Sequence, residues 1–190
     1  MVDFYIVLDF EATCEKDIRI RAPEIIEFPL VVIDAREKRI IDEIQIYVKP
    51  LIRPILTPFC IELTGISQET VDGATDFPRA MKQIMSFLDK YSNFAFITCG
   101  NWDLETMLPI QAAHSRIKIR DCFSRWINIK AEYQRCYNER ARGMLFMLNR
   151  LGITLTGRHH SGIDDCRNIA KIVIHMLRAN FKLKQTNKLK

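Results

Sequence analysis

Short apolar runs separated by polar links make up the first half of the chain. Runs rich in β-branched and aromatic residues cover 5–10, 25–33 and 40–48, and a later apolar run covers 94–99. Runs of this length and composition predict β-strands. Pro29 lies inside the second run and cannot donate a ladder hydrogen bond, so we expect this strand at a sheet edge or at a bulge.

The apolar spacing changes to a helical period after residue 66. Apolar residues recur three and four positions apart over 81–88 and 144–151, which predicts two amphipathic helices. Another helix is expected to begin near Trp102 and to be interrupted at Pro109, whose ring cannot continue a regular helix. The remaining expected elements are a proline-rich connection over 50–66, a short helical turn from Ser67 and a last helix over about 164–178.

Strands followed by helices that are interleaved with a late strand predict an α/β fold with a mixed sheet. The chain has 190 residues, of which 48% are hydrophobic, and this is enough to bury one core. We therefore expect a single domain over 1–180. A polar, basic tail over 181–190 is expected to fray.

Composition excludes several classes of protein. The six cysteines contain no C-x-x-C pair and lie mostly in apolar stretches, which favours reduced thiols over a disulfide framework or a zinc site. The sequence has neither a basic N-terminal segment followed by an apolar run nor an apolar stretch of the ~20 residues that cross a bilayer. We expect a protein of the cytoplasm or nucleus that is not secreted.

Charge is distributed unevenly along the chain. Residues 1–115 hold 11 Lys or Arg and 18 Asp or Glu, whereas residues 116–190 hold 17 and five. An acidic half joined to a basic half is typical of a protein that gathers cations in one place and polyanions nearby. A basic tail that only increases solubility explains the charge equally well.

Asp9 and Glu11 lie at the end of the first predicted strand. Because side chains alternate along a strand, both acids share a face with Tyr5 and Val7. Two carboxylates on one face of a buried strand repel each other unless a cation lies between them. The simpler interpretation is that the strand reaches solvent by Glu11, since short acidic patterns recur by chance.

Two further acids begin predicted helices. Asp103 follows the late strand, where an acid commonly caps a helix. Asp165 heads the apolar stripe of the last helix and needs a partner, which is either a metal ion or the end of its own helix. Asp164 heads the polar stripe and is expected to face water. The apolar stripe continues through Ile169, Ile172 and Met176, and the polar stripe through Asn168, Lys171 and His175.

A histidine precedes the last helix. His160 lies five residues before Asp165, in a loop with Gly157 and Gly162. A neutral imidazole beside a metal site is a suitable acceptor for the proton of a bound water. His159 is the alternative candidate, and an ordinary surface position is the default for either histidine.

Taken together, these motifs resemble those of the DEDDh 3′→5′ exonucleases, a family with an RNase H-like fold. Asp9, Glu11 and Asp103, followed by His160 and Asp165, match the family's motifs in order and spacing. The subgroup that trims histone mRNA 3′ ends, small RNAs and ribosomal RNA (the enhanced-RNAi, or snipper-like, exonucleases) is the nearest resemblance. Its motifs are matched by Asp9–Cys14, Glu24–Pro29, Phe59–Ile66, Trp102–Asp103, Trp126–Ile129 and Ser161–Asp165, and the resemblance covers roughly residues 3–178.

The resemblance implies a role for each acid. Asp9 would bridge two divalent cations, Mg²⁺ or Mn²⁺, while Glu11 and Asp165 would each bind one. Asp103 would act mainly through a coordinated water, and His160 would be the general base. Substrate contacts are implied for Glu11, Ala12, Thr13, Thr64, Gly65, Ile66, Trp102 and His160. Ordinary core packing is the alternative for Trp102 and Ile66.

The implied activity is hydrolysis of single-stranded RNA from its 3′ end to nucleoside 5′-monophosphates. A DNA-directed enzyme of the same fold and a catalytically silent RNA-binding adaptor are the alternatives. Some relatives carry a nucleic-acid-binding domain before the nuclease, whereas this sequence begins three or four residues before its first expected strand. The resemblance therefore implies the cleavage machinery but leaves open the recognition of a particular RNA stem-loop. Candidate phosphate contacts are Arg116, Lys118, Arg120, Arg140, Arg142 and the lysines of the tail.

Overall fold

The computed structural model describes residues 2–18 and 20–188, which form a mixed sheet of seven strands with helices on both faces. The strands are β1 (Phe4–Leu8), β2 (Glu11–Ala12), β3 (Ile25–Asp34), β4 (Arg39–Tyr47), β5 (Phe94–Thr98), β6 (Arg125–Asn128) and β7 (Asn187–Lys188). The helices are α1 (Pro58–Thr64), α2 (Gln68–Asp72), α3 (Phe77–Leu88), α4 (Leu108–His114), α5 (Ile129–Tyr137), α6 (Met144–Arg150) and α7 (Gly162–Arg178). A π-helical segment, η1 (Trp102–Met107), precedes α4, and a 3₁₀ turn, η2 (Asp121–Ser124), precedes β6.

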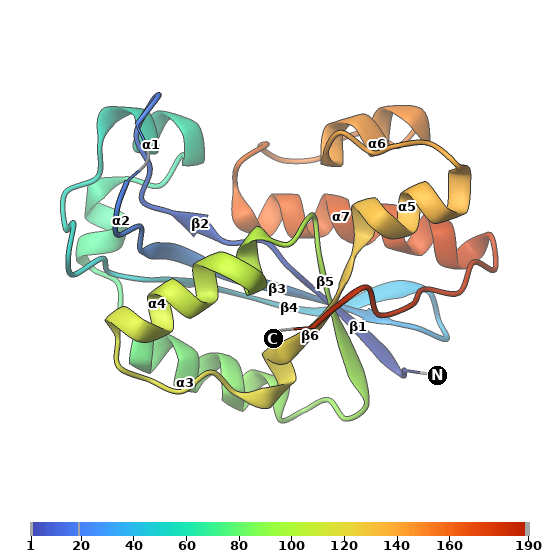
Figure 1. Ribbon diagram of the computed structural model, residues 1–190, viewed down its shortest axis with the longest axis horizontal. Helices are drawn as coiled ribbons and strands as arrows, with labels where there is room; N and C mark the ends of the chain where they lie inside the picture. Colours follow the sequence, from blue (N-terminus) through green and yellow to red (C-terminus); the bar gives the residue numbers. More distant parts are fainter. Residues whose placement is uncertain (1, 19, 189–190) are drawn as a thin grey trace.

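The strand β1 lies in the middle of the sheet. It pairs antiparallel with β3 and parallel with β5, and β6 lies parallel to β5 on the far side. In Figure 1, α3 and α4 lie below the sheet, whereas α5, α6 and α7 lie above it. The predicted α/β fold with a mixed sheet flanked by helices is therefore confirmed.

Successive side chains of β1 point to opposite faces of the sheet, so this strand contributes to the apolar core on both sides. Ile6 and Leu8 point to the side of α3 and α4, whereas Tyr5 and Val7 pack with α7. Helix α7 buries Ile169, Ile172 and Met176 completely, in agreement with the predicted apolar stripe. Because Asp9 and Glu11 follow β1 on the face of Tyr5 and Val7, they lie on the same side of the sheet as α7.

Pro29 does not lie on an edge strand, because β3 has partners on both sides. The pairing of β1 with β3 ends at Leu8 and Leu30, and the pairing of β2 begins at Glu11 and Glu27. Pro29 thus lies opposite the interruption between β1 and β2, where its missing N–H costs no ladder hydrogen bond. Of the two alternatives predicted for Pro29, the sheet edge was wrong, whereas an irregularity of the ladder, as at a bulge, does lie beside it.

The structure differs from the sequence-based expectations in three other places. The connection over 50–66 contains the helix α1, whose first turn is capped by the Thr57 hydroxyl accepting from Cys60 N at 3.0 Å. The strand β6 and helix α5 were not predicted. Asn168, expected on an exposed stripe, is fully buried, and its side chain is bonded to both the N–H and the C=O of Thr156.

The tail does not fray over the residues that are described. Thr186 Oγ1 accepts from Asn128 N at 2.6 Å, and β7 pairs antiparallel with β6. The buried carboxylate of Glu132 accepts from Lys184 N at 2.8 Å, and the Arg135 guanidinium lies 4.1 Å from the centroid of the Phe181 ring. Residues 189–190, which end the predicted basic tail, lie outside the described residues.

None of the helices formed by the described residues has the length and apolar character needed to cross a lipid bilayer. All six cysteines are free thiols.

Candidate active site

Asp9 and Glu11 come from the interruption between β1 and β2. Glu11 opens β2 directly opposite Glu27 and is only 9% exposed. Across residues 2–18 and 20–188, no protein group donates a hydrogen bond to the carboxylate of Asp9 or of Glu11. Burial, followed by the charge of Glu27, raises the pKa of Glu11 to about 9. These two carboxylates are therefore costly to ionise without a cation.

Asp103 is positioned by the π-helical segment η1. Its carboxylate accepts from Phe10 N at 2.9 Å, which ties the first turn of η1 to the connection that carries Asp9. Burial raises the pKa of Asp103 to about 6, although the bond from Phe10 and the charge of Lys130 both lower it. Lys130, in the first turn of α5, thus brings positive charge to the site, and the sequence reasoning did not select it.

Asp165 lies in the first turn of α7 and is 3% exposed. Its carboxylate accepts from His160 N at 3.0 Å and lies 3.1 Å from His159 Nδ1. Burial raises the pKa of Asp165, and these two contacts oppose the shift. Asp165 therefore points into the protein, and its side chain does not cap its own helix.

The four acids converge at one end of the sheet. Burial raises the pKa of Asp9 well above its ordinary value, and the negative charges of Asp103, Asp165 and Glu11 raise it further. Acids that are far apart in the sequence therefore act on one another through space. The donor set contains only carboxylate oxygens, which hard divalent cations prefer. That these four residues bind metal stays a prediction.

Glu27 is a fifth acid at this site that the sequence reasoning missed. Its carboxylate is 1% exposed and accepts from Gly162 N at 3.0 Å and Ile163 N at 2.9 Å, the first two N–H groups of α7. At Gly162 a Cβ would come within 2.8 Å of the Asp9 carbonyl oxygen, so only glycine allows this approach. Glu27 therefore fixes the helix that carries Asp165 against the strand connection that carries Asp9.

Asp164 does not face water as expected. Its carboxylate accepts from Arg158 N at 2.9 Å and forms an ion pair with Arg167 at 2.9 Å, and its side chain is only 20% exposed. Asp164, the first residue of the polar stripe of α7, thus contacts the loop before the helix and Arg167. The carboxylate of Asp164 is bonded to Arg158 and Arg167, whereas that of Asp165 contacts the two histidines.

His159 and His160 lie side by side next to Asp165. Their rings stack with centroids 3.9 Å apart. Partial burial, followed by the neighbouring His159, lowers the pKa of His160, so its ring is neutral at pH 7 and able to accept a proton. His159 makes the direct contact with Asp165, and the structure therefore places both candidate histidines at the site.

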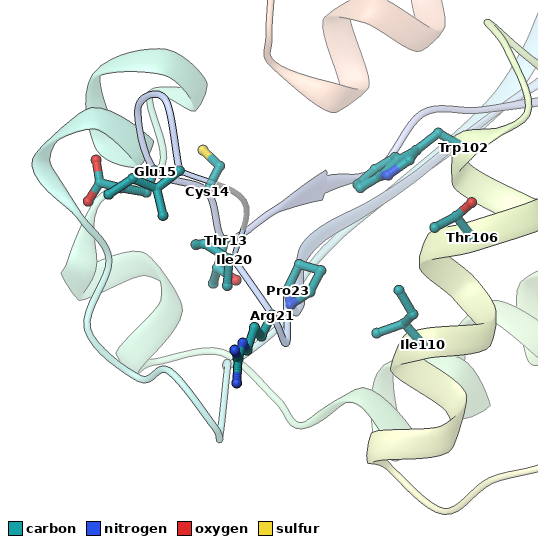
Figure 2. Close-up of a pocket in the computed structure, with 10 residues that line it drawn as sticks. Thr13, Cys14, Glu15, Ile20, Arg21, Pro23, Trp102, Thr106 and Ile110 are labelled. Atoms are coloured by element: carbon teal, nitrogen blue, oxygen red, sulfur yellow. The ribbon is translucent and has the colours of Figure 1, made fainter.

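A cleft opens between the segment that follows β2 and the helices η1 and α4 (Figure 2). Its volume is about 410 Å³, and Thr13 and Pro23 face Trp102 and Ile110 across it. Trp102 is 46% exposed, so it is not packed in the core. Two residues predicted to contact substrate, Thr13 and Trp102, thus line one cleft, whereas its other lining residues were not predicted. Those others are Cys14, Glu15, Ile18, Ile20, Arg21, Pro23, Thr106 and Ile110.

The other predicted substrate contacts surround α1 and β2. Ala12 is buried in β2, and Thr64 is 2% exposed, with its hydroxyl bonded to Cys60 O. Gly65 adopts a left-handed conformation with φ of 75° at the end of α1 and lies under the side chain of Arg158. Ile66 is 4% exposed within an apolar cluster, which matches the core-packing alternative for this side chain.

Comparison with known proteins agrees with this geometry. The exonuclease family (RNase_T) matches residues 6–173. The chain belongs to this family. A human relative, ERI1 exoribonuclease 3, is 41% identical over 194 residues, which cover 97% of this chain and 57% of the relative. The chain therefore spans little more than half the length of the curated relatives it matches.

Solved structures give the same assignment. The nuclease domain of 3′hExo, a DEDDh family member bound to rAMP, superimposes with a TM-score of 0.95 at 37% identity, covering 99% of this chain and 98% of that domain. A complex in which a 3′-exonuclease recognises the 3′ end of the histone mRNA stem-loop gives a TM-score of 0.96 at 36% identity, covering 100% of this chain and 88% of that one. The DEDDh exonuclease fold is thus shared along the whole chain.

Proposed function

We propose that this chain is a 3′→5′ exonuclease that hydrolyses single-stranded RNA to nucleoside 5′-monophosphates. The observation that carries the proposal is the convergence of Asp9, Glu11, Asp103 and Asp165, two of which have no protein donor. The names of the similar proteins, which are exoribonucleases, favour RNA over DNA. In the cell we place the protein in the cytoplasm or the nucleus, where RNA 3′ ends are exposed.

The proposed cofactors are two Mg²⁺ or Mn²⁺ ions. The exonuclease family depends on divalent cations, and an all-carboxylate donor set suits hard ions that keep part of their water shell. Asp9, Glu11, Asp103 and Asp165 would hold them. Two bound ions supply stabilisation of the charge on the attacking and leaving oxygens of the phosphodiester.

The remaining steps belong to side chains of this protein. His160, neutral at pH 7, accepts the proton of the attacking water at a ring nitrogen. Trp102, exposed at the edge of the cleft, stacks on a base near the 3′ end, since every base offers a π-face. The backbone of Ala12 and Thr13, with Glu11, meets the terminal 3′-hydroxyl. Arginines and lysines of the second half bind phosphates, so affinity falls with added salt.

The decisive experiment is digestion of 5′-end-labelled RNA with a free or a blocked 3′ end. The proposal expects shortening one nucleotide at a time from the free end, release of 5′-monophosphates, protection by the blocked end and complete inhibition by EDTA. A DNA oligomer of the same sequence is the matched control. Faster degradation of DNA than of RNA, or RNA binding without any cleavage in Mn²⁺, would each contradict the proposal.

Replacing His160 tests which of the two histidines is the general base. His160→Ala is expected to lower kcat by about 10²–10⁴-fold, which is the usual contribution of a positioned acid or base. The measurement is single-turnover cleavage of a short RNA at saturating Mg²⁺. Near-normal turnover in this variant would indicate that His159, and not His160, is the general base.

A further inference from the structure

Two neighbouring histidines share one side of the chain because of an unusual backbone conformation. In an extended chain, consecutive side chains point to opposite sides. His160 instead has φ of 66°, in the left-handed region, and this turn brings its ring onto that of His159. Both imidazoles are half-buried beside the carboxylate of Asp165. One ligand atom from each of the three residues lies within 4.8 Å of the other two.

The spacing of these donors fits a small metal ion. In a tetrahedral Zn²⁺ site with bonds of ~2.0–2.1 Å, neighbouring ligand atoms are about 3.3 Å apart. His159 Nδ1 already lies 3.1 Å from Asp165 Oδ2 and 3.2 Å from Oδ1. Asp165 is almost completely buried, so its position is fixed before any ion arrives. The ligand atom of His160 lies within 4.8 Å of both others, so a small adjustment of the three side chains would complete the set.

The charged neighbours of the two histidines are engaged elsewhere. The guanidinium of Arg158 bonds to the carbonyl oxygens of Glu62 and Leu63. Asp164 is bonded to Arg158 N and paired with Arg167. Neither residue therefore occupies the space between the imidazoles and Asp165.

We propose that His159, His160 and Asp165 form a second metal site, specific for a transition-metal ion such as Zn²⁺, with a water as fourth ligand. Two imidazoles and one carboxylate suit Zn²⁺ and bind Mg²⁺ poorly, whereas the all-oxygen set of Asp9, Glu11, Asp103 and Asp165 has the opposite preference. Because Asp165 belongs to both sets, the two kinds of ion compete for it.

Occupation of this site inhibits cleavage, and this consequence rests on the proposed function. A ring nitrogen of His160 that is bonded to Zn²⁺ cannot accept the proton of the attacking water. Zinc thus acts as an inhibitor that removes the base, rather than as a substitute for Mg²⁺.

Direct binding tests the site without any measurement of activity. Zn²⁺ is titrated calorimetrically into the protein at constant Mg²⁺, which occupies the other all-oxygen donors and competes with Zn²⁺ only for Asp165. One Zn²⁺ is expected per chain, and His159→Asn, which retains a side-chain donor for Asp165, is expected to weaken binding at least about tenfold. His175→Ala, which removes an exposed histidine elsewhere on α7, is the matched control and is expected to bind like the parent.

Cu²⁺ used as a probe counts the nitrogen ligands. Electron paramagnetic resonance is expected to show coupling to two imidazole nitrogens in the parent and to one in His159→Asn. His159→Gln is tested in parallel, and thermal unfolding of each variant checks that it folds. Unchanged zinc affinity in both folded variants, or the same nitrogen count as the parent, would overturn the proposed site.

A cleavage assay tests the inhibition separately. Zn²⁺ added at constant Mg²⁺ is expected to inhibit the parent and the His175→Ala variant at the concentration that fills the site. Each protein is compared with its own zinc-free rate, and the His159→Asn variant is expected to need at least about tenfold more zinc. Equal inhibition of all three would refute the inhibitory role. Absence of cleavage in every protein without zinc would instead refute the proposed function, while the titration would still decide the site.

Discussion

Two groups of buried or half-buried carboxylates in this protein differ in their hydrogen-bond donors. Immediately before β3, Glu24 accepts from the three backbone N–H groups of residues 51–53, and on β3, Glu27 accepts from the first turn of α7 and from Gln45. At the end of β1, Asp9 and Glu11 have no protein donor among the residues that are described. Glu24, Glu27 and Glu11 are all less than 10% exposed, so burial alone does not separate the two groups.

The difference separates acids that hold the fold together from acids that await a ligand. The donors of Glu27 oppose the effect of burial, although burial still raises its pKa. A buried carboxylate with two or three donors is tolerated in the folded state, because these hydrogen bonds offset much of the cost of burying its charge. A buried carboxylate without donors destabilises the metal-free protein and is tolerated where function needs it. Replacing members of the two groups is therefore expected to change stability in opposite directions.

The largest effect is expected for Asp9. Asp9→Asn removes the acid whose pKa the other three raise, and it is expected to lower cleavage by at least about 10³-fold, since a lost metal ligand costs several kcal/mol of charge stabilisation. The same variant is expected to stabilise the metal-free protein by about 1 kcal/mol, because repulsion among the acids is relieved. RNA cleavage and urea unfolding in EDTA measure the two effects, and a loss of stability would show that Asp9 belongs to the other group.

The pH dependence of stability is the second test. Folded Glu11 keeps its proton up to a pKa of about 9, whereas in the unfolded chain it ionises near its ordinary value of 4.5. Between these values the unfolded state binds fewer protons, so the free energy of unfolding falls as pH rises. Metal-free protein is expected to melt at least about 5 °C lower at pH 8.5 than at pH 5.5, corresponding to roughly 2 kcal/mol.

Two controls apply to this melting experiment. Saturating Mg²⁺ is expected to remove most of the decrease, and Glu11→Gln is expected to reduce it without added metal. A melting temperature that rises with pH in EDTA would mean that the carboxylates of the site are compensated by groups of the protein.

The third test concerns Glu27. In the parent, two N–H groups of α7 donate to the carboxylate of Glu27. Glu27→Gln replaces this carboxylate with an amide, which has only one acceptor oxygen, and is expected to destabilise the protein by about 1–3 kcal/mol. Urea unfolding measures this change. Cleavage is expected to fall as well, because the helix that carries Asp165 loses its attachment to β3. A stabilised variant would place Glu27 with the acids that await a ligand.

The smallest effect is expected for Asp164. Asp164→Ala removes the ion pair with Arg167 and the acceptor for Arg158 N, both near the surface, and is expected to cost about 0.5–1.5 kcal/mol. Cleavage is expected to remain close to that of the parent. If this variant is inactive while Asp165→Ala is not, the assignment of the two faces of α7 is reversed.

The sequence predicted those parts of the fold that depend on local periodicity. The strands β1, β3, β4 and β5 and the buried stripe of α7 follow from the spacing of apolar residues, and the acids follow from their places on these elements. Helix α1 has little apolar periodicity and depends on the cap by Thr57. Partners distant in the chain decide the rest: Asn168 is buried by bonds to Thr156, and Glu27 acquires its donors from residues 135 and 136 positions away.

The wide turn η1 contains a residue that the helix could lose. The N–H of Leu108 bonds to the carbonyl of Asp103, five residues back, so this turn contains one residue more than an α-helical turn. Deleting a single residue after Asp103 would let the turn close as a regular α-helix, and Asp103 would keep nearly the same direction relative to α4, because five residues of a π-turn and four of an α-turn span almost the same rotation. This segment is thus expected to accept substitutions at exposed positions such as Glu105 and to tolerate a one-residue shortening better than a regular helix would.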